Sequence, residues 1–373
     1  MSVHAQNFYK RFFGKKDSTQ CQEVDHADGG WIYLPIVYYT PDTRFGFGGL
    51  VGRYFHLTAS PEDTLTRLSY VKLFSTYTLN RQIDIWNSFN IFFPNETWMM
   101  KGEFRFKHFP DSYYGIGNSL LQRTEQTLRK ERYEYNQFTF NIAGFRRIYP
   151  QMFIGLNYEL NTYINLQSLG GDPNRELPLE ILDGLVNGSS GGTTSGIGIS
   201  WSWDKRENLF NSRTGMLFEV QSTFFGKFIG SSYDYQNYKI TYNKYYPIKR
   251  KAAFAFQFVG NFNRGTPPFF RLAPVGGDNI LRGYAQNLYR DQNMLGSQAE
   301  IRFPLWWRFG GVSFVGIGDI FDSSRDLSFN RIKYSFGTGL RFTLDEHENV
   351  NLRLDFGFGR QSSGFYFSIG EAF

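Results

Sequence analysis

Apolar and polar residues alternate with a period of two through most of the chain from Trp31 to Phe373. In the segment 154–160, Ile, Leu, Tyr and Leu alternate with Gly, Asn and Glu, and in the segment 352–358, Leu and Phe alternate with Arg, Asp and Gly. One such run is weak support for a β-strand, because short alternating runs also arise by chance. Their repetition along the whole chain favours an all-β fold.

The alternating runs predict about sixteen strands. Their lengths suit tilted strands that cross a membrane, and their number is even, as in bacterial outer-membrane barrels. The predicted strands lie near residues 31–39, 45–56, 66–78, 82–93, 97–107, 132–149, 152–166, 194–205, 214–225, 233–248, 252–263, 294–306, 309–321, 332–343, 349–360 and 364–373.

The lengths of the connections support the same fold. The three longest, 108–131, 167–193 and 264–293, all follow odd-numbered strands, whereas connections after even-numbered strands are mostly short. Membrane β-barrels have long loops on one side and short turns on the other. The sequence therefore predicts a transmembrane antiparallel β-barrel over residues 31–373.

Composition agrees with a barrel and excludes a helical membrane protein. The chain has 40 Phe and 24 Tyr, yet its mean hydropathy is −0.41. Outward apolar residues that alternate with inward polar ones give such an average. No run reaches the roughly 18 apolar residues that a membrane-spanning helix requires.

Charge and candidate chemistry narrow the function. The net charge of +6 suits an acidic partner such as lipid phosphate, but the basic residues are scattered, so we expect no nucleic-acid partner. The single Cys21 and the five His lack metal-ligand spacing, so we expect neither metal nor cofactor. Ser189 and Ser190 have no His nearby in sequence, and we expect no enzymatic activity.

Residues 1–30 form an N-terminal extension. They contain no charged segment followed by an apolar one, so a complete signal peptide is not expected there. Phe8, Tyr9, Phe12 and Phe13 lie among basic residues, and the segment is either an export remnant or a short amphipathic helix. Thirty residues are too few for a periplasmic binding domain of ordinary size.

A glycine-rich loop carries the main candidate site. It contains Gly276 and Gly277, followed by the motif Leu281-Arg282-Gly283-Tyr284. The guanidinium of Arg282 can bind a carboxylate through two N–H groups, and Glu300 or Asp319 in the following strands could supply it. Glu300 shares the polar face of its strand with Gln298 and Arg302, so we expect it to face the interior.

Three pieces in order resemble the BamA/TamA-type outer-membrane assembly-factor superfamily, also called the bacterial surface antigen family. They are the loop motif 281–284, the strand 296–304 and the pair Gly318-Asp319. The segment 114–118 is a weaker match. The resemblance implies that the loop folds into the lumen, that Arg282 pairs with Glu300 and Asp319, and that the protein resides in the bacterial outer membrane. It further implies a branch without periplasmic polypeptide-transport (POTRA) domains.

The junction between the first and last strands, here called the seam, is a candidate gate. Pro35 in the first strand lacks a backbone N–H, and the last strand contains Gly364 and Gly370. The seam either opens laterally, as in the family's insertases, or is fully paired. Phe373 ends the chain in strand phase, as in the assembly signal of outer-membrane barrels, and Glu371 is expected at the membrane interface.

The resemblance implies a component of protein or lipid insertion or translocation at the outer membrane. The expected partners are outer-membrane lipid and lipopolysaccharide, together with separate periplasmic or lipoprotein partners. The alternative is a plugged passive channel or a structural barrel.

Overall fold

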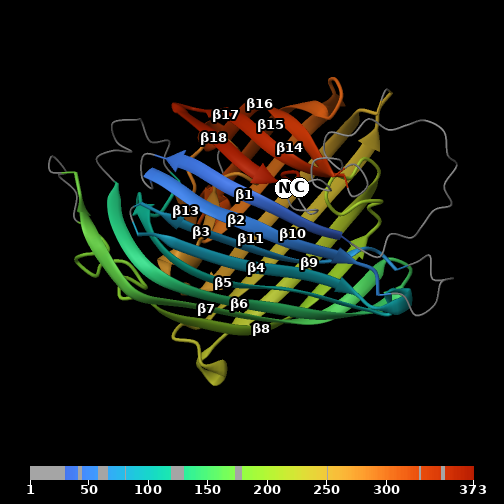
Figure 1. Cartoon of the computed structure of the whole chain (residues 1–373). Coiled ribbons are helices and arrows are strands. Elements are labelled where there is room, and N and C mark those ends of the chain that lie inside the picture. Colours follow the sequence, from blue (N-terminus) through green and yellow to red (C-terminus); the bar gives the residue numbers. More distant parts are fainter. Residues whose placement is uncertain are drawn as a thin grey trace, which may run out of the picture.

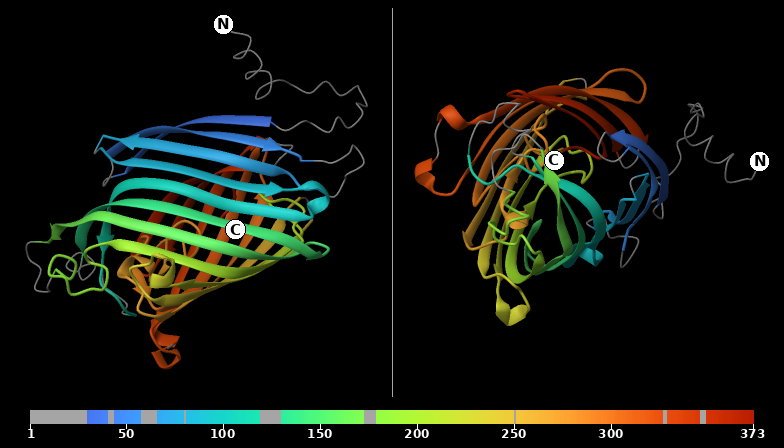
Figure 2. Two further views of the ribbon diagram at one scale, coloured as in Figure 1. Left: turned by 90° about the horizontal axis from the view of Figure 1, so that it is seen from below. Right: turned by 90° about the vertical axis from the view of Figure 1, so that its left-hand side faces the viewer.

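A computed structural model describes residues 30–40, 44–57, 66–79, 81–118, 130–172, 179–249, 251–326, 329–345 and 349–373. Sixteen strands form one sheet (Figure 1). Each pairs with the next strand of that sheet along the chain, and all of these pairings are antiparallel. Figure 2 shows the strands curving around a common interior. The predicted fold, a sixteen-stranded antiparallel barrel, is confirmed.

The strand bounds follow the alternating pattern closely. The strands of the barrel are β1 (Gly30–Thr40), β2 (Arg44–Phe55), β3 (Ser69–Thr78), β4 (Ile83–Phe92), β5 (Trp98–Tyr113), β6 (Glu131–Tyr149), β7 (Met152–Gly171), β8 (Gly192–Asp204), β9 (Gly215–Phe225), β10 (Tyr235–Pro247), β11 (Ala253–Gly265), β14 (Asn293–Pro304), β15 (Phe309–Phe321), β16 (Lys333–Asp345), β17 (Val350–Gly359) and β18 (Ser362–Ile369). Short 3-10 helices are η1 (Pro94–Glu96), η2 (Lys227–Ile229), η3 (Phe269–Arg271), η4 (Ser324–Asp326) and η5 (Phe329–Arg331). Among the described residues no helix is long and apolar enough to cross a membrane.

Side chains alternate between two environments along each strand. On β14, Ile301 is 47% exposed, whereas its neighbour Glu300 is 1% exposed. Because successive strand residues point to opposite faces, the apolar set faces outward and the polar set faces inward. The prediction that Gln298, Glu300 and Arg302 share the inner face agrees with their burial.

The connection from β11 to β14, residues 266–292, is here called the inward loop. It contains a short hairpin of β12 (Ala273–Val275) and β13 (Tyr289–Asp291), which the sequence did not reveal. Leu281, Tyr284 and other apolar residues of the loop form a buried cluster with Met294 of β14 and Ile320 of β15. Apolar burial thus holds the loop inside the barrel.

The end of the chain differs from the expected strand 364–373. β18 ends at Ile369, and Gly370 adopts a φ of +91°, which favours glycine. Glu371 then points inward, where its side chain is buried against Arg341 and Asn351. Its expected place at the membrane interface is therefore wrong, because two arginines on the inner wall bind its carboxylate.

Candidate functional site

The motif of the inward loop owes its shape to residues with positive φ. Gly276, Gly277 and Gly283 have φ values of +109°, +100° and +120°, and Leu281 has +49°. A Cβ on Gly283 would lie 2.6 Å from the backbone of Phe358. Only glycine fits there, because the loop backbone presses directly against β17.

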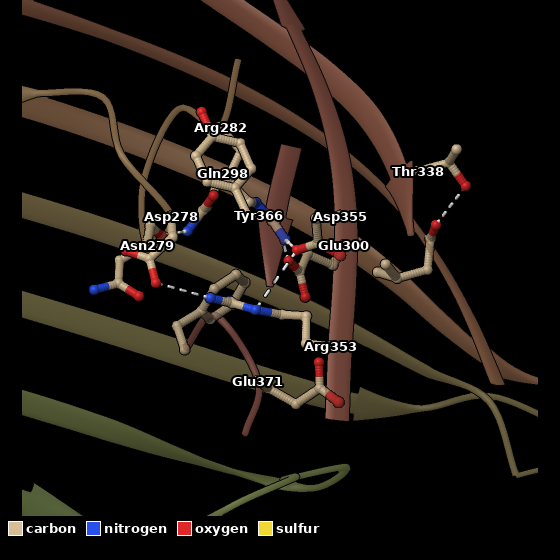
Figure 3. A network of polar contacts seen from close by, with 12 residues as sticks. Asp278, Asn279, Arg282, Gln298, Glu300, Thr338, Arg353, Asp355, Tyr366 and Glu371 are labelled. Carbon is tan, nitrogen blue, oxygen red and sulfur yellow. Dashed lines mark hydrogen bonds and ion pairs between the residues drawn. The ribbon is translucent and has the colours of Figure 1, made fainter. Parts of the chain in front are cut away.

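Arg282 is fully buried and binds two carboxylates on different strands. It donates from Nη2 to Glu300 on β14 and from Nη1 to Asp355 on β17, the latter at 2.5 Å (Figure 3). Its guanidinium also lies 3.6 Å from the ring centroid of Phe314 on β15. Arg282 therefore joins strands that are separated by two others in the sheet.

The same carboxylates bind further arginines. Arg302 donates to Glu300 at 2.9 Å, and Arg341 donates to Asp355 at 2.6 Å and to Glu371 at 2.8 Å. Buried charges are tolerated when each has partners of opposite sign, as here. We call this set the ion network; its members are Asp278, Arg282, Glu300, Arg302, Arg341, Arg353, Asp355 and Glu371.

Two tyrosines fix the loop backbone and the aromatic end of the motif. Tyr284 is fully buried; its hydroxyl donates to the carbonyl of Tyr334 at 3.0 Å and accepts the N–H of Arg360 at 2.9 Å. Burial raises the pKa of Tyr284, so its hydroxyl stays protonated and can donate. Tyr366 on β18 accepts the N–H of Gly283 at 2.8 Å.

Asp319, the second expected partner of Arg282, binds a different cation. Lys333 on β16 is fully buried and donates to Asp319 at 3.0 Å. Lys333 also donates to Asn118. Asn118 is the last residue of the segment 114–118, the weaker family match, which lies in the connection between β5 and β6. The second carboxylate that binds Arg282 is therefore Asp355 and not Asp319. The curvature of the sheet brings β17, which carries Asp355, next to the loop.

Two of the expected seam residues, Pro35 and Gly364, lie on the two end strands of the sheet order, whereas Gly370 follows β18 at the bend. Pro35 is exposed and lies opposite Gly49 in the β1–β2 ladder, and Gly364 lies opposite Gly357 in the β17–β18 ladder. A Cβ on Gly364 would approach the Tyr366 hydroxyl to 2.4 Å. Gly364 thus leaves room for the ring of Tyr366, which holds the loop.

Phe373 does not continue the last strand, contrary to expectation. Its carbonyl oxygen accepts from Arg302 at 2.9 Å, and its ring stacks on that of Tyr245 with centroids 6.4 Å apart. Both partners are buried residues of the inner wall. Residues 370–373, here called the C-terminal tail, therefore turn into the lumen after the bend at Gly370.

Sequence reasoning missed several residues of this site. Asp355, Gly357 and Gly359 follow one another at alternate positions on the inner face of β17. A Cβ on Gly357 would lie 2.5 Å from the Arg282 backbone, and one on Gly359 would lie 2.6 Å from the Tyr284 ring. A sequence signal for these residues exists: a carboxylate is followed by two glycines at alternate positions of one strand. Glycines in a strand often indicate that another backbone approaches closely.

Fold and site together define a class of protein: sixteen-stranded membrane barrels whose lumen holds a loop anchored through a buried arginine. The sequence profile described as the Omp85 superfamily domain matches residues 57–373. The chain belongs to the Omp85 superfamily and is an outer-membrane β-barrel. The family resemblance and the bacterial outer membrane as its location are confirmed.

Two solved structures show the same fold. BamA from Haemophilus ducreyi, in a crystal structure lacking POTRA domains 1-3, has a TM-score of 0.53 and 12% identity, with 92% of this chain and 69% of that chain covered. CdiB from Acinetobacter baumannii has a TM-score of 0.56 and 13% identity, with 92% and 59% covered. Comparison with the curated proteins gives no match.

Proposed function

We propose that this barrel is a component of protein or lipid insertion or translocation at the outer membrane, acting through a seam between β1 and β18 that opens toward lipid. The observation that carries the proposal is the contact of Tyr366 with the inward loop. Tyr366 belongs to β18, an end strand of the sheet order, and binds the backbone at Gly283. A movement of the end strand is thereby transmitted to the loop.

The composition of the end strands supports an opening seam. β18 has only eight residues, against eleven in β1. Pro35 of β1 cannot donate a backbone hydrogen bond. The C-terminal tail leaves the strand and binds the inner wall instead, through Glu371 and the Phe373 carbonyl. Few ladder hydrogen bonds can form between two such strands, so little free energy is required to separate them.

A pair of engineered cysteines tests the seam. One cysteine is placed in the range 31–39 and the other in 364–373, and the full chain is reconstituted in liposomes with an unfolded eight-stranded test barrel. We expect the oxidised pair to slow folding of the test barrel and reductant to restore it. The matched control places cysteines at Ser222 and Tyr238, which face each other in the β9–β10 ladder. Efficient locking with unchanged folding of the test barrel would contradict the proposal.

Outer-membrane lipid, including lipopolysaccharide, and periplasmic or lipoprotein partners complete the proposed assembly. The turn between β14 and β15 carries Trp306, which is 67% exposed, and Trp307. This turn follows β14, whereas the inward loop precedes it, so the two lie at opposite ends of the barrel. Such exposed tryptophans suit the membrane interface or a protein contact. A pull-down from native membranes, with Trp306→Ala and Trp307→Ala as comparison, identifies the partners and whether this turn recruits them.

A plugged passive channel is the second candidate, and the packing of the inward loop in the lumen favours it. Buried Leu281 and Tyr284 occupy space that an open pore would need. Conductance in planar bilayers separates the two functions. A small conductance that does not change when the seam cysteines are oxidised supports the plugged channel, whereas a flickering conductance that stops on oxidation supports the insertion component.

A further inference from the structure

The lumen contains a second polar site that the ion network does not use. A cavity of about 280 Å³ lies between the inner faces of β5–β7, the facing strands β10 and β11, and the inward loop. Five cations line it, against one carboxylate. These charged lining residues are Arg105, Lys107, Asp111, Lys239, Arg271 and Arg290.

Three of the cations form ion pairs with two carboxylates. Arg105 binds Asp84 through two hydrogen bonds, at 2.8 and 2.5 Å. Lys239 and Arg271 share Glu159, at 3.4 and 2.8 Å. The five cations exceed the carboxylates of Asp84, Glu159 and Asp111 by two positive charges. Lys107 and Arg290 are the two lining cations that form no ion pair among the described residues.

Arg290 is a buried cation with weak partners. It is 2% exposed, and among the described residues its guanidinium donates to backbone carbonyls, of which the nearest lie 3.4 Å away. Within this part of the chain its Nε has no hydrogen-bond partner. Among the described residues no carboxylate forms an ion pair with it. A buried charge in this state is costly, and an anion in the cavity would compensate it.

Lys107 is the second cation without a carboxylate among the described residues. Its Nζ donates to the hydroxyl of Tyr135 at 3.3 Å and lies 4.8 Å from the ring centroid of Phe109. Lys107 and Arg290 line the same cavity from the wall and from the loop. Asp111 lines the cavity as well, but its Oδ2 accepts from Tyr133 and Asn287. With five cations against this one lining carboxylate, the cavity suits an oxyanion such as phosphate.

The rest of the lining suits a polyhydroxylated ring. The rings of Tyr135 and Tyr163 lie 5.0 Å apart, and Phe270 stacks on Tyr163 at 4.0 Å. Asn237 lines the opposite wall, and its buried Oδ1 has no hydrogen-bond partner among the residues that the structure describes. Aromatic faces pack against apolar C–H surfaces, and a free amide oxygen accepts a hydroxyl proton.

The cavity is open to solvent in the lumen. The side chains of Arg105 and Lys239 keep 35% and 40% of their surface exposed. A cavity of this volume is at the small end of ligand sites and limits the ligand to one or two sugar rings.

We propose that this cavity binds a phosphate-bearing sugar of one or two rings. Lys107 and Arg290 hold the phosphate, while Asn237 and the tyrosine rings contact the sugar. This site goes beyond the proposed insertion function, because its residues lie apart from the seam and from the ion network.

Calorimetric titration of the full chain in detergent tests the site with glucose 6-phosphate, glucose and inorganic phosphate at one ionic strength. We expect glucose 6-phosphate to bind at least about tenfold more tightly than either fragment, and Lys107→Gln to weaken it by about tenfold. The matched control is Lys101→Gln, on the same strand but paired with Glu219; it should bind as the unaltered chain does.

Each other outcome overturns part or all of the proposal. Absence of binding, or equal binding by the Lys107→Gln variant, refutes the phosphate site. Inorganic phosphate that binds as tightly as glucose 6-phosphate refutes the sugar contacts. Since Arg290→Gln leaves a packed side chain without its charge and can impair folding, Arg290→Lys serves as the second variant, with folding checked by heat-modifiability. A folded Arg290→Lys variant should bind glucose 6-phosphate more weakly, because lysine lacks the planar fork.

Discussion

Tyr366, on the last strand, donates its hydroxyl proton to the carbonyl oxygen of Tyr284, on the inward loop, at 3.1 Å. The same hydroxyl accepts the N–H of Gly283. These contacts satisfy two backbone groups of the loop motif at once, in a place where water has little access. These two hydrogen bonds therefore tie the inward loop to β18, the last strand of the barrel.

Tyr366→Phe should lower the free energy of unfolding by about 1–3 kcal/mol, because it leaves the buried N–H of Gly283 without a partner while keeping the ring. The carbonyl of Tyr284 still accepts the N–H of Gly277. The measurement is the temperature at which the folded band disappears on a heat-modifiability gel. Tyr246→Phe, at an exposed position of β10, is the control. Equal transition temperatures for the two variants would show that the Tyr366 hydroxyl does not stabilise the loop.

Arg282→Ala should destabilise the barrel more strongly, by about 3–5 kcal/mol, because Glu300 and Asp355 are then buried without their shared cation. Arg282→Lys keeps the charge but cannot reach both carboxylates with a planar fork, so we expect an intermediate loss. Urea unfolding in lipid measures both. Arg264→Ala, at an exposed position at the end of β11 before the same loop, should have little effect. A stability of Arg282→Ala equal to that of the control would refute the docking.

Double-mutant cycles separate the two candidate carboxylates. Arg282→Ala combined with Asp355→Asn should show a coupling of about 0.5–3 kcal/mol, because the two residues share a hydrogen bond. Arg282→Ala combined with Asp319→Asn should be additive within about 0.5 kcal/mol, since Asp319 binds Lys333 instead. Strong coupling to Asp319 would restore the pairing that the sequence motif implied.

The sequence predicts that the side chain of Glu300 points into the barrel, because strand phase depends only on alternation, which the sequence shows directly. It does not predict which of Glu300, Asp319 and Asp355 binds Arg282. All three face inward and are buried, and their distances from Arg282 depend on how the sheet curves and on how deeply the loop descends. Neither quantity is encoded in local periodicity.

The alternation of apolar and polar residues also does not predict that the C-terminal tail turns into the lumen. Phe365, Phe367 and Ile369 alternate as a strand, and Phe373 continues the same phase. The bend requires the positive φ of Gly370 and the attraction of Glu371 to Arg341. The sequence shows the glycine and the carboxylate, but the arginines that bind the carboxylate lie on distant strands.

Gly357→Ala tests the close approach of the loop to β17. The added Cβ would lie 2.5 Å from the Arg282 backbone, so the loop must shift, and we expect a loss of about 1–3 kcal/mol. Gly144→Ala on β6 is the matched control, since no atom of the described residues outside its own chain neighbours lies within 4 Å of its added Cβ. The comparison uses heat-modifiability together with protease protection of the loop. Full protection in Gly357→Ala would mean that the wall adapts and that the contact is not tight.

The C-terminal tail should be sensitive to acid through Glu371. Burial alone would raise the pKa of this carboxyl, but the guanidiniums of Arg302 and Arg341 hold it below its ordinary value. Because the folded pKa is lower than the unfolded one of about 4.3, the stabilisation is present above that pH and is lost as the pH falls through the folded pKa.

Glu371→Gln should therefore be less stable than the unaltered chain at neutral pH, by about 1.5–3 kcal/mol for hydrogen bonds to a charged group. The difference should shrink as the pH falls below about 4, since the unaltered carboxyl then becomes neutral as well. Urea unfolding in lipid across a pH series measures the difference, and Asp183→Asn, at an exposed position of the β7–β8 connection, is the control. A difference that stays constant with pH would show that Glu371 stabilises the tail through its shape and not through its charge.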